Sequence, residues 1–211
     1  MMRPLRIALT KGRLETRATS LFQTMGLDCK HLIKKGRKLI LPVDDFEVVL
    51  AKAADVITYV EHGACDIGIV GKDTIVEYDP EIYEMTDLGF GKCIFALACK
   101  KGSDFYSGYT EKVVATKYPN VARKFFEGKG MDVKIIKIEG SVELAPLLDL
   151  ADAIVDIVET GKTIKENGLM VIEEIMPISA RVIVNIASMK LRKEEIESFL
   201  ADVELAKEII E

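Results

Sequence analysis

The sequence predicts an α/β protein whose sheets are mixed and mainly parallel. Short apolar runs recur along the chain, and stretches with apolar residues at helical spacing separate them. Strands that alternate with helices in this way imply a mainly parallel sheet. The composition agrees, because 49% of the 211 residues are hydrophobic and 30% are charged, as in globular proteins. The pattern alone leaves open whether the chain forms one lobe or two.

The first half opens with a strand over 5–9 and a helix over 14–25 that Gly26 can end. Strands follow at 38–42, 47–50 and 66–70, with helices at 54–62 and from about 72 to 77. The pattern restarts near Gly89. Strands are then predicted at 93–99, 112–115, 133–138, 153–158, 169–178 and 181–187, with helices at 119–130, 142–148 and from about 193 onward.

Bulk properties exclude several classes of protein. The net charge of −5 argues against general nucleic-acid binding, so an anionic ligand has to be drawn by local basic residues. The four cysteines form no C-x-x-C pair and are expected to be reduced, and two histidines make a zinc site improbable. No apolar run has transmembrane length and no secretory signal is evident, so we expect a cytoplasmic protein that does not bind membranes.

The most informative segment is Asp156-Ile157-Val158-Glu159-Thr160-Gly161-Lys162-Thr163, which follows a buried-type run. A strand that turns into a helix start presents free N–H groups and a positive dipole end to an anion. Two acids just before that turn can accept hydrogen bonds from sugar hydroxyls. Together they suggest a site for a phosphorylated ribose.

Two other interpretations compete with a phosphoribose site in this segment. A P-loop requires glycine five residues before the Gly161-Lys162 pair, and Asp156 stands there, so we reject it. An ordinary strand–turn–helix junction with a threonine cap fits the segment equally well when it is taken alone.

The wider segment, from Glu143 to Thr163, resembles the phosphoribosyl-diphosphate (PRPP) signature of ATP phosphoribosyltransferases. Family-like pieces also occur, in order along the chain, at Thr10-Lys11-Gly12-Arg13, at Tyr59–Gly68 and at Ala115-Thr116-Lys117-Tyr118-Pro119-Asn120-Val121-Ala122-Arg123. Two departures matter: Asp149 stands where the family usually has glycine, and Lys52 where it usually has arginine, whose planar two-point contact lysine cannot make.

The resemblance implies the two-lobed fold of periplasmic binding proteins of type II, with a central cleft. Residues 1–90 and 176–211 are then a discontinuous first lobe on the ATP side, and 91–175 an inserted second lobe with the PRPP segment. The implied reaction transfers phosphoribosyl from PRPP to N1 of ATP and releases pyrophosphate, the first step of histidine biosynthesis. The alternative is a non-catalytic small-ligand binding protein of the same fold.

The resemblance also implies roles for individual residues. Those expected to bind PRPP are Glu143, Asp156, Glu159, Thr160, Gly161, Lys162 and Thr163. Glu143, which follows Ser141, has a second interpretation as an acid that favours the start of a helix. Lys11, Arg13 and Arg37 are expected to act in catalysis by neutralising the departing pyrophosphate, although the cluster 34–38 resembles an ordinary basic surface.

The residues expected around ATP are Leu9, Lys52, Asp66, Gly68 and Cys93. Core packing explains Gly68 and Cys93 equally well. Mg²⁺ is the expected cofactor; it would be carried by PRPP or pyrophosphate, and no protein ligand is assigned to it.

The resemblance finally implies partners. The chain stops at Glu211, soon after the last predicted helix, which matches short family members that lack a C-terminal histidine-binding domain. Such members pair with a separate regulatory subunit related to histidyl-tRNA synthetase. We therefore expect a homodimer when the chain is alone, and a hetero-oligomer that histidine inhibits when the partner is present.

Overall fold

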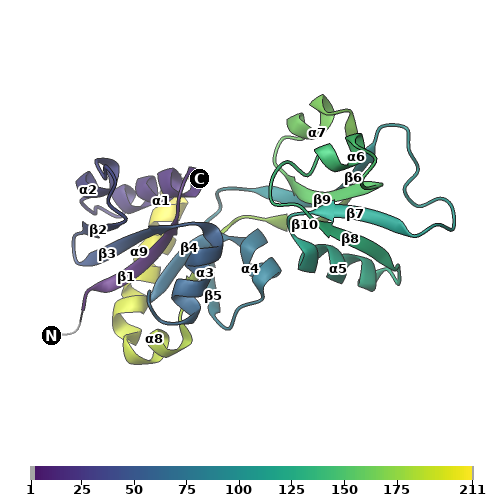
Figure 1. Ribbon diagram of the computed structural model, residues 1–211. Coiled ribbons are helices and arrows are strands. Elements are labelled where there is room, and N and C mark those ends of the chain that lie inside the picture. The colour runs from purple at the N-terminus through teal and green to yellow at the C-terminus, as the bar shows by residue number, and fades with distance from the viewer. Residues whose placement is uncertain (1–2, 211) are drawn as a thin grey trace. The chain divides into compact units, whose positions relative to one another are not determined.

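The computed structural model describes residues 3–210, without the side chain of Ile210, and divides into two compact units (Figure 1). Unit 1 comprises Met1–Gly91 and Ser179–Glu211, and unit 2 comprises Lys92–Ile178. The sequence-based boundaries were 90/91 and 175/176. Residues 1, 2 and 211, including the chain end from which a short form was expected, lie outside the described residues.

The sheet of unit 1 has six strands in the order β2-β3-β1-β4-β11-β5. Strands β3, β1 and β4 are parallel neighbours, and β11 runs antiparallel between β4 and β5. Four strands, β3, β1, β4 and β5, therefore point the same way. The strands are β1 (Leu5–Thr10), β2 (Ile40–Val43), β3 (Phe46–Ala51), β4 (Ile67–Gly71), β5 (Tyr83–Asp87) and β11 (Ala180–Val184).

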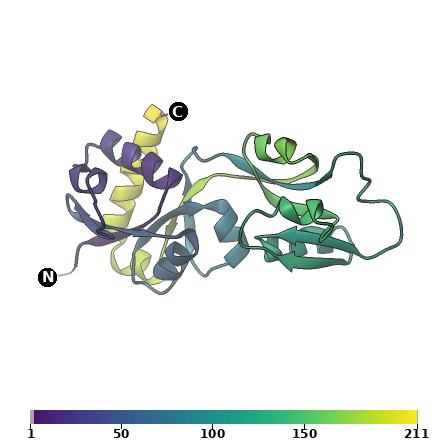
Figure 2. The same cartoon turned by 45° about the horizontal axis from the view of Figure 1, so that its top comes forward.

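Helices cover both faces of this sheet. On one face, Phe22 of α1 packs edge-on against Phe199 of α9, with ring centroids 6.3 Å apart, and the two helices lie side by side in both views (Figure 1, Figure 2). On the other face, α3 and α4 contribute Val56, Val60 and Ile75 to a second cluster. The helices of unit 1 are α1 (Arg13–Thr24), α2 (Lys30–Ile33), α3 (Ala53–Glu61), α4 (Lys72–Tyr78), α8 (Ile186–Leu191) and α9 (Lys193–Ile210).

The sheet of unit 2 has the order β10-β6-β9-β7-β8. Strands β9, β7 and β8 are parallel neighbours, and β6 runs antiparallel between β9 and β10, so four of the five strands share a direction. Helix α5 lies on one face, and α6 and α7 lie on the other (Figure 1). The elements are β6 (Cys93–Lys100), β7 (Lys112–Thr116), α5 (Pro119–Gly128), β8 (Val133–Lys137), α6 (Leu144–Leu147), β9 (Ala153–Val158), α7 (Lys162–Glu166) and β10 (Leu169–Ile178).

The predicted strand over 181–187 was too long. It ends at Val184 because the side chain of Asn185 accepts a hydrogen bond from the N–H of Ser188, at 2.8 Å, and starts helix α8. Strand β5 was missed. It is an edge strand in which only Thr86 is buried, so no apolar alternation marks it.

Two further expectations concern the cysteines and the membrane. None of the four cysteines takes part in a disulfide bond with another residue that the structure describes, and burial raises the pKa of Cys65 to about 11. Among residues 3–210 no helix combines the length and the apolar character that crossing a bilayer requires.

Gly68 occupies a place in β4 where a side chain would collide with the core. A methyl group there would lie 2.8 Å from Cγ1 of Ile183 and 2.8 Å from Cγ2 of Val60. We therefore expect Gly68→Ala to lower the free energy of unfolding by about 1–3 kcal/mol, the usual range for overpacking. Urea unfolding followed by circular dichroism measures it.

The control is Gly128→Ala in α5, because no atom lies within 4 Å of the added methyl group. Alanine favours a helix over glycine, so this variant should be as stable as wild type or more stable by up to about 1 kcal/mol. Equal stability of Gly68→Ala and wild type would contradict the packing explanation.

Candidate functional site

The carboxyl ends of β7, β8 and β9 meet at one edge of the unit 2 sheet, because parallel strands carry these ends to the same side. The predicted PRPP residues gather there. Residues 159–163 directly follow β9, and Glu143 directly precedes α6 in the connection after β8. We call Glu143, Asp156 and residues 159–163 the β9 corner.

Asp156 lies inside β9, on the face that α6 and α7 cover. Ile154 and Val158 pack in the cluster with Ile164 of α7, and side chains alternate along a strand, so Asp156 shares their face. Asp156 is half-buried, and Glu159, one residue beyond the strand, is exposed. The two acids therefore flank the end of the strand from which the chain turns into α7.

The turn itself depends on Gly161. Its φ of 70° lies in the left-handed region that favours glycine, and its C=O accepts from the N–H of Lys165 at 3.0 Å, which closes the first turn of α7. Thr160 Oγ1 accepts from the N–H of Lys162 at 3.4 Å. Lys162 pairs with Glu166 at 3.8 Å, but both side chains are exposed, so the pair contributes little.

Glu143 occupies the residue before α6, and its φ and ψ are already helical. Its side chain makes no capping hydrogen bond to that helix, and it is half-buried. Glu143 therefore does not cap α6 through a side-chain hydrogen bond, and both interpretations, a ligand of PRPP and an acid that favours the helix start, keep it at the β9 corner.

A second group of predicted residues meets at the carboxyl edge of the unit 1 sheet. Lys11 and Arg13 follow β1, and Lys52 follows β3, the parallel neighbour of β1. The N–H of Lys11 donates to the C=O of Ala51 at 2.9 Å, which brings the two loops together. We call Lys11, Arg13, Arg37 and Lys52 the cation edge.

Arg37 reaches this edge through the pairing of β2 with β3. Ile40 lies opposite Val49, and the N–H of Leu50 donates to the C=O of Leu39 at 2.8 Å, so the segment before β2 runs past the carboxyl end of β3. The loop is also tied to the start of α1, because Lys35 forms an ion pair with Glu15. The basic cluster is thus held next to the loop after β1.

Three residues expected around ATP are engaged by the fold instead. Leu9 is fully buried in the main core of unit 1, and Gly68 lies beneath Ile183 and Val60. Asp66 precedes β4, so it lies at the amino edge of the sheet, opposite the cation edge. Leu9 lies near the cation edge, two residues before Lys11, but its side chain is buried in the core, and neither Gly68 nor Asp66 lies at that edge. Lys52 lies at that edge, and Cys93 lies beside Glu159 in unit 2, since Ile94 pairs with Val158.

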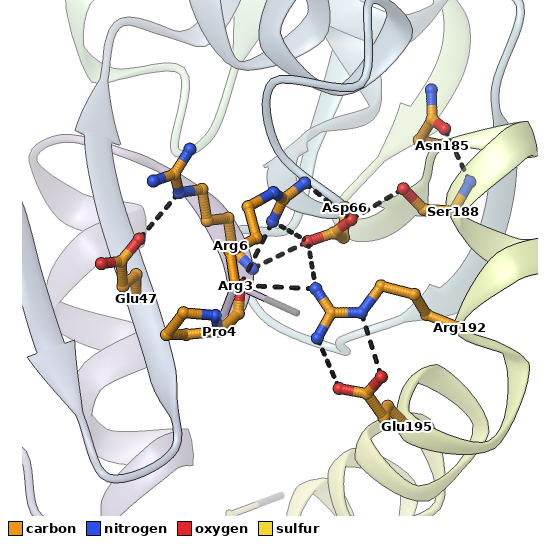
Figure 3. A network of polar contacts seen from close by, with 9 residues as sticks. All are labelled: Arg3, Pro4, Arg6, Glu47, Asp66, Asn185, Ser188, Arg192 and Glu195. Atoms are coloured by element: carbon orange, nitrogen blue, oxygen red, sulfur yellow. Dashed lines mark hydrogen bonds and ion pairs between the residues drawn. The ribbon is translucent and has the colours of Figure 1, made fainter. Parts of the chain in front are cut away.

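Asp66 is the centre of a polar network (Figure 3). Only 1% of it is exposed. Its Oδ2 accepts from Arg3 Nη1 at 2.6 Å, from the N–H of Arg6 at 2.9 Å and from Arg192 Nη1 at 3.2 Å, and its Oδ1 accepts from Ser188 Oγ at 2.7 Å. The carboxylate therefore joins the start of β1, β4, α8 and the start of α9.

The charge state of Asp66 follows from these contacts. Burial alone raises the pKa of this carboxyl group, but the hydrogen bonds from Arg3, from the N–H of Arg6 and from Ser188 outweigh it and hold the pKa below the ordinary value. Sequence reasoning missed Arg3, Ser188 and Arg192. No local motif marks them, because the network depends on residues more than 60 positions apart.

Comparisons with known proteins show the family of this chain. The sequence profile of the HisG family, ATP phosphoribosyltransferase, matches residues 52–205. An ATP phosphoribosyltransferase from Clostridium kluyveri is 61% identical over 205 residues, which are 96% of this chain and 94% of that enzyme. One from Clostridium acetobutylicum is 58% identical over 201 residues, 94% of each chain. The chain belongs to the ATP phosphoribosyltransferase family.

Membership of this family confirms the expected enzyme class, a pentosyl transferase. It also confirms the expected function, transfer of phosphoribosyl to ATP in the first step of histidine biosynthesis. The alternative, a non-catalytic binding protein, is not favoured.

Solved structures confirm the fold. The ATP phosphoribosyl transferase (HisG:HisZ) complex from Thermotoga maritima contains a chain with a TM-score of 0.85 and 35% identity, and the match covers 97% of this chain and 98% of that one. The periplasmic aliphatic sulphonate binding protein SsuA from Escherichia coli has a TM-score of 0.58 at 10% identity, covering 98% of this chain and 73% of that one. The second likeness shows the periplasmic-binding-protein fold alone.

The departure from the family at Asp149 leaves the local turn intact. Asp149 has a φ of 55°, the left-handed conformation for which the family uses glycine, and aspartate tolerates this conformation better than most residues. Its carboxylate pairs with Lys100, which holds the pKa of Asp149 below its ordinary value. The turn that follows α6 therefore has a left-handed residue at Asp149 although no glycine stands there.

The Asp66 network predicts a stability effect that depends on pH. We expect Asp66→Asn to lower the free energy of unfolding by about 3 kcal/mol at pH 7, because Arg192 and Arg3, both half-buried, lose the buried carboxylate with which they pair. The pKa of Asp66 is lowered in the folded protein, so its contribution is present above the ordinary value and is lost as the pH falls through the folded value. Urea unfolding at pH 7 and pH 3 should therefore show that the difference in free energy of unfolding between wild type and Asp66→Asn is smaller at pH 3.

Asp28→Asn is the matched control, because the ion pair of Asp28 with Lys30 is exposed. It should leave the unfolding midpoint unchanged. Steady-state assays below the unfolding temperature separate the two roles of Asp66: a structural residue leaves the KM for ATP unchanged. A raised KM for ATP with unaltered stability would identify Asp66 as an ATP ligand instead.

Proposed function

We propose that the β9 corner binds the phosphoribosyl group of PRPP. One observation carries this proposal: left-handed Gly161 turns the backbone of residues 160–163 across the carboxyl end of β9, next to Asp156 and Glu159. N–H groups in the first turn of a helix lack partners within the helix and suit a phosphate. Carboxylates suit the ribose hydroxyls. Thr160 and Thr163 add hydroxyl donors for the phosphate.

The cation edge neutralises the diphosphate. The transition state at C1 of the ribose develops charge on the departing pyrophosphate, and fixed cations stabilise that charge most strongly when it is fully formed. Arg13 and Arg37 present planar forks that fit phosphate oxygens, and Lys11 adds a point charge. Because the chain carries a net charge of −5, this local cluster supplies the attraction that the whole protein lacks.

Lys52 and Cys93 are the ATP-side candidates that this proposal keeps, because Leu9 and Gly68 are buried in the core and Asp66 lies at the amino edge of the sheet. Lys52 is the exposed residue that directly precedes α3, and it lies beside the loop after β1. As a lysine it contacts ATP through one charge where the family's arginine makes two parallel contacts. Cys93 is partly buried and small enough to lie against a flat base.

Mg²⁺ enters with the substrate. Within the described part of the chain no group of three or more histidine, cysteine, aspartate or glutamate side chains forms a metal-holding cluster. Mg²⁺ usually binds through substrate phosphates with few protein groups, so it would come to the site with the diphosphate. When bound, the ion neutralises charge on the diphosphate.

The chain works together with a regulatory subunit. The HisG chain of Thermotoga maritima that resembles it was solved in complex with HisZ. We place this protein among the short members of the family, active as a homodimer when alone and inhibited by histidine only when a separate histidyl-tRNA-synthetase-like subunit is present. A histidine titration of the purified chain, with and without that subunit, distinguishes this arrangement from a histidine site within the chain itself.

The direct test of the reaction is to mix the purified protein with ATP, PRPP and Mg²⁺ and to follow phosphoribosyl-ATP by its ultraviolet absorbance. Product should form only when all three are present. PRPP binding without product, under conditions that preserve the fold, would favour the non-catalytic alternative.

Thr163 should donate its hydroxyl to the 5′-phosphate. Thr163→Val keeps the shape and removes the donor, so PRPP binding should weaken by about 1–3 kcal/mol, the cost of leaving a polar partner unsatisfied. Isothermal titration calorimetry with PRPP and Mg²⁺ measures this. Thr110→Val, at an exposed loop position of the same unit, is the control and should bind as wild type does. Unaltered PRPP affinity in Thr163→Val would remove Thr163 from the phosphate site.

Arg37 should act mainly in the transition state. Arg37→Ala is therefore expected to lower kcat by about 100-fold while raising the Michaelis constants much less, as for other lost stabilisers of developing charge. Lys34→Ala, in the same exposed loop, serves as the control for the loss of one positive charge. Single-turnover rates that match wild type in both Arg37→Ala and Arg13→Ala would show that these arginines are surface charges only.

A further inference from the structure

Strands β7 and β9 separate at the point where the β9 corner begins. Their parallel register ends with the pair Thr116 and Val155. Beyond this pair β7 turns through Lys117 and Tyr118 into α5 on one face of the sheet, whereas β9 continues for three residues and leads to α7 on the opposite face (Figure 1). Neighbouring strands whose connections leave to opposite faces create the crevice in which α/β sheets bind ligands.

A buried hydroxyl holds this point of separation. Thr116 is fully buried, and its Oγ1 donates to the C=O of Val155 at 2.6 Å and accepts from the N–H of Tyr118 at 2.9 Å. The first bond fixes β9 next to β7 at their last shared pair. The second fixes the turn by which β7 leaves the sheet. Tyr118 is held as well, because its ring packs edge-on against Phe95 with centroids 4.9 Å apart.

Asp156 is the residue directly after Val155. Its position relative to the loop at 159–163 therefore depends on where the backbone of Val155 lies. Thr116 faces the α5 side of the sheet, since Ala115 packs on the α6 and α7 side and side chains alternate along the strand. The hydroxyl of Thr116 therefore acts on the strand that carries Asp156 from the face opposite to the one on which Asp156 lies.

We propose that Thr116 is a positioning residue for PRPP: its hydroxyl sets the place of Asp156 against the ribose without touching the substrate. This inference rests on the proposed function, in which Asp156 accepts hydrogen bonds from the sugar. The threonine serves both strands at once, since one hydroxyl is a donor to one backbone and an acceptor for the other. Valine has the same shape and offers neither bond.

The experiment compares PRPP dissociation constants, measured by calorimetry, among variants of the full chain. Thr116→Val should raise the constant by 10- to 100-fold, the scale on which small displacements of binding groups act, while the KM for ATP stays unchanged. Thr116→Ser, which keeps the hydroxyl, should bind PRPP about as tightly as wild type.

The matched control is Val114→Ala. Val114 lies two residues earlier in β7, on the same side and equally buried, so its truncation loosens the same strand without removing a hydrogen bond. Urea unfolding midpoints should show that Val114→Ala and Thr116→Val are both folded and both less stable than wild type. The proposal predicts that Val114→Ala keeps its affinity for PRPP.

Equal PRPP affinities of Thr116→Val and Val114→Ala would overturn the proposal, and so would a Thr116→Ser variant that binds as poorly as Thr116→Val. If Thr116→Val does not fold, Thr116→Ala replaces it, because the smaller side chain leaves room for water at the two backbone groups. Its PRPP affinity is then compared with those of Val114→Ala and Thr116→Ser in the same way. If wild type binds PRPP without making product, the reaction assignment fails while the affinity comparison still decides the role of Thr116. If wild type does not bind PRPP, both proposals fail.

Discussion

The direction of the parallel strands is the constraint on which the rest of this structure depends. Each sheet has three neighbouring parallel strands, so their carboxyl ends and the loops that follow lie along one edge. In unit 1 this edge collects cations from the loops after β1 and β3. In unit 2 it collects acids, threonines and a left-handed glycine after β8 and β9. The shared direction of the parallel strands thus brings together residues that are far apart in the chain.

The two carboxyl edges differ in the charged and polar groups that they carry. The cation edge carries positive charge suited to a diphosphate, and the β9 corner carries carboxylates suited to sugar hydroxyls and N–H groups suited to one phosphate. A single corner with both sets would pair its own acids with its own bases. The Asp66 network shows what such pairing does in this protein: its carboxylate is buried, its arginines are engaged, and it lies at the amino edge of the sheet, where it joins elements of the fold.

Much of this arrangement could be predicted from the sequence, because the strands are apolar runs and α1 and α9 have one apolar face each. The turn at Gly161 and the acids before it are local, so a motif reveals them. Strand β5 and helix α8 escaped prediction for a physical reason. The first is an exposed edge without alternation, and the second starts at an asparagine that reads equally well as the end of a strand.

The residues around ATP show a different limit. Gly68 and Asp66 lie in a segment that resembles the family, and Leu9 directly precedes another, yet the fold uses them for packing and for a buried ion network. Long-range contacts of this kind leave no local signal. Only the placement of β4 between β1 and β11 shows that Asp66 faces away from the cation edge. A resemblance identifies segments, and the structure decides which edge each residue faces.

The function that we propose places the phosphoribosyl group at the carboxyl end of β9. Amide hydrogen exchange of the full chain, with and without PRPP and Mg²⁺, tests it most directly, because it reports the bound segment without requiring turnover. We expect slowed exchange at residues 160–164, where backbone N–H groups would bind the phosphate, and unchanged exchange around Asp66 and Ser188 at the amino edge of unit 1. Protection at the amino edge, with residues 160–164 exchanging as fast as in the free protein, would contradict it.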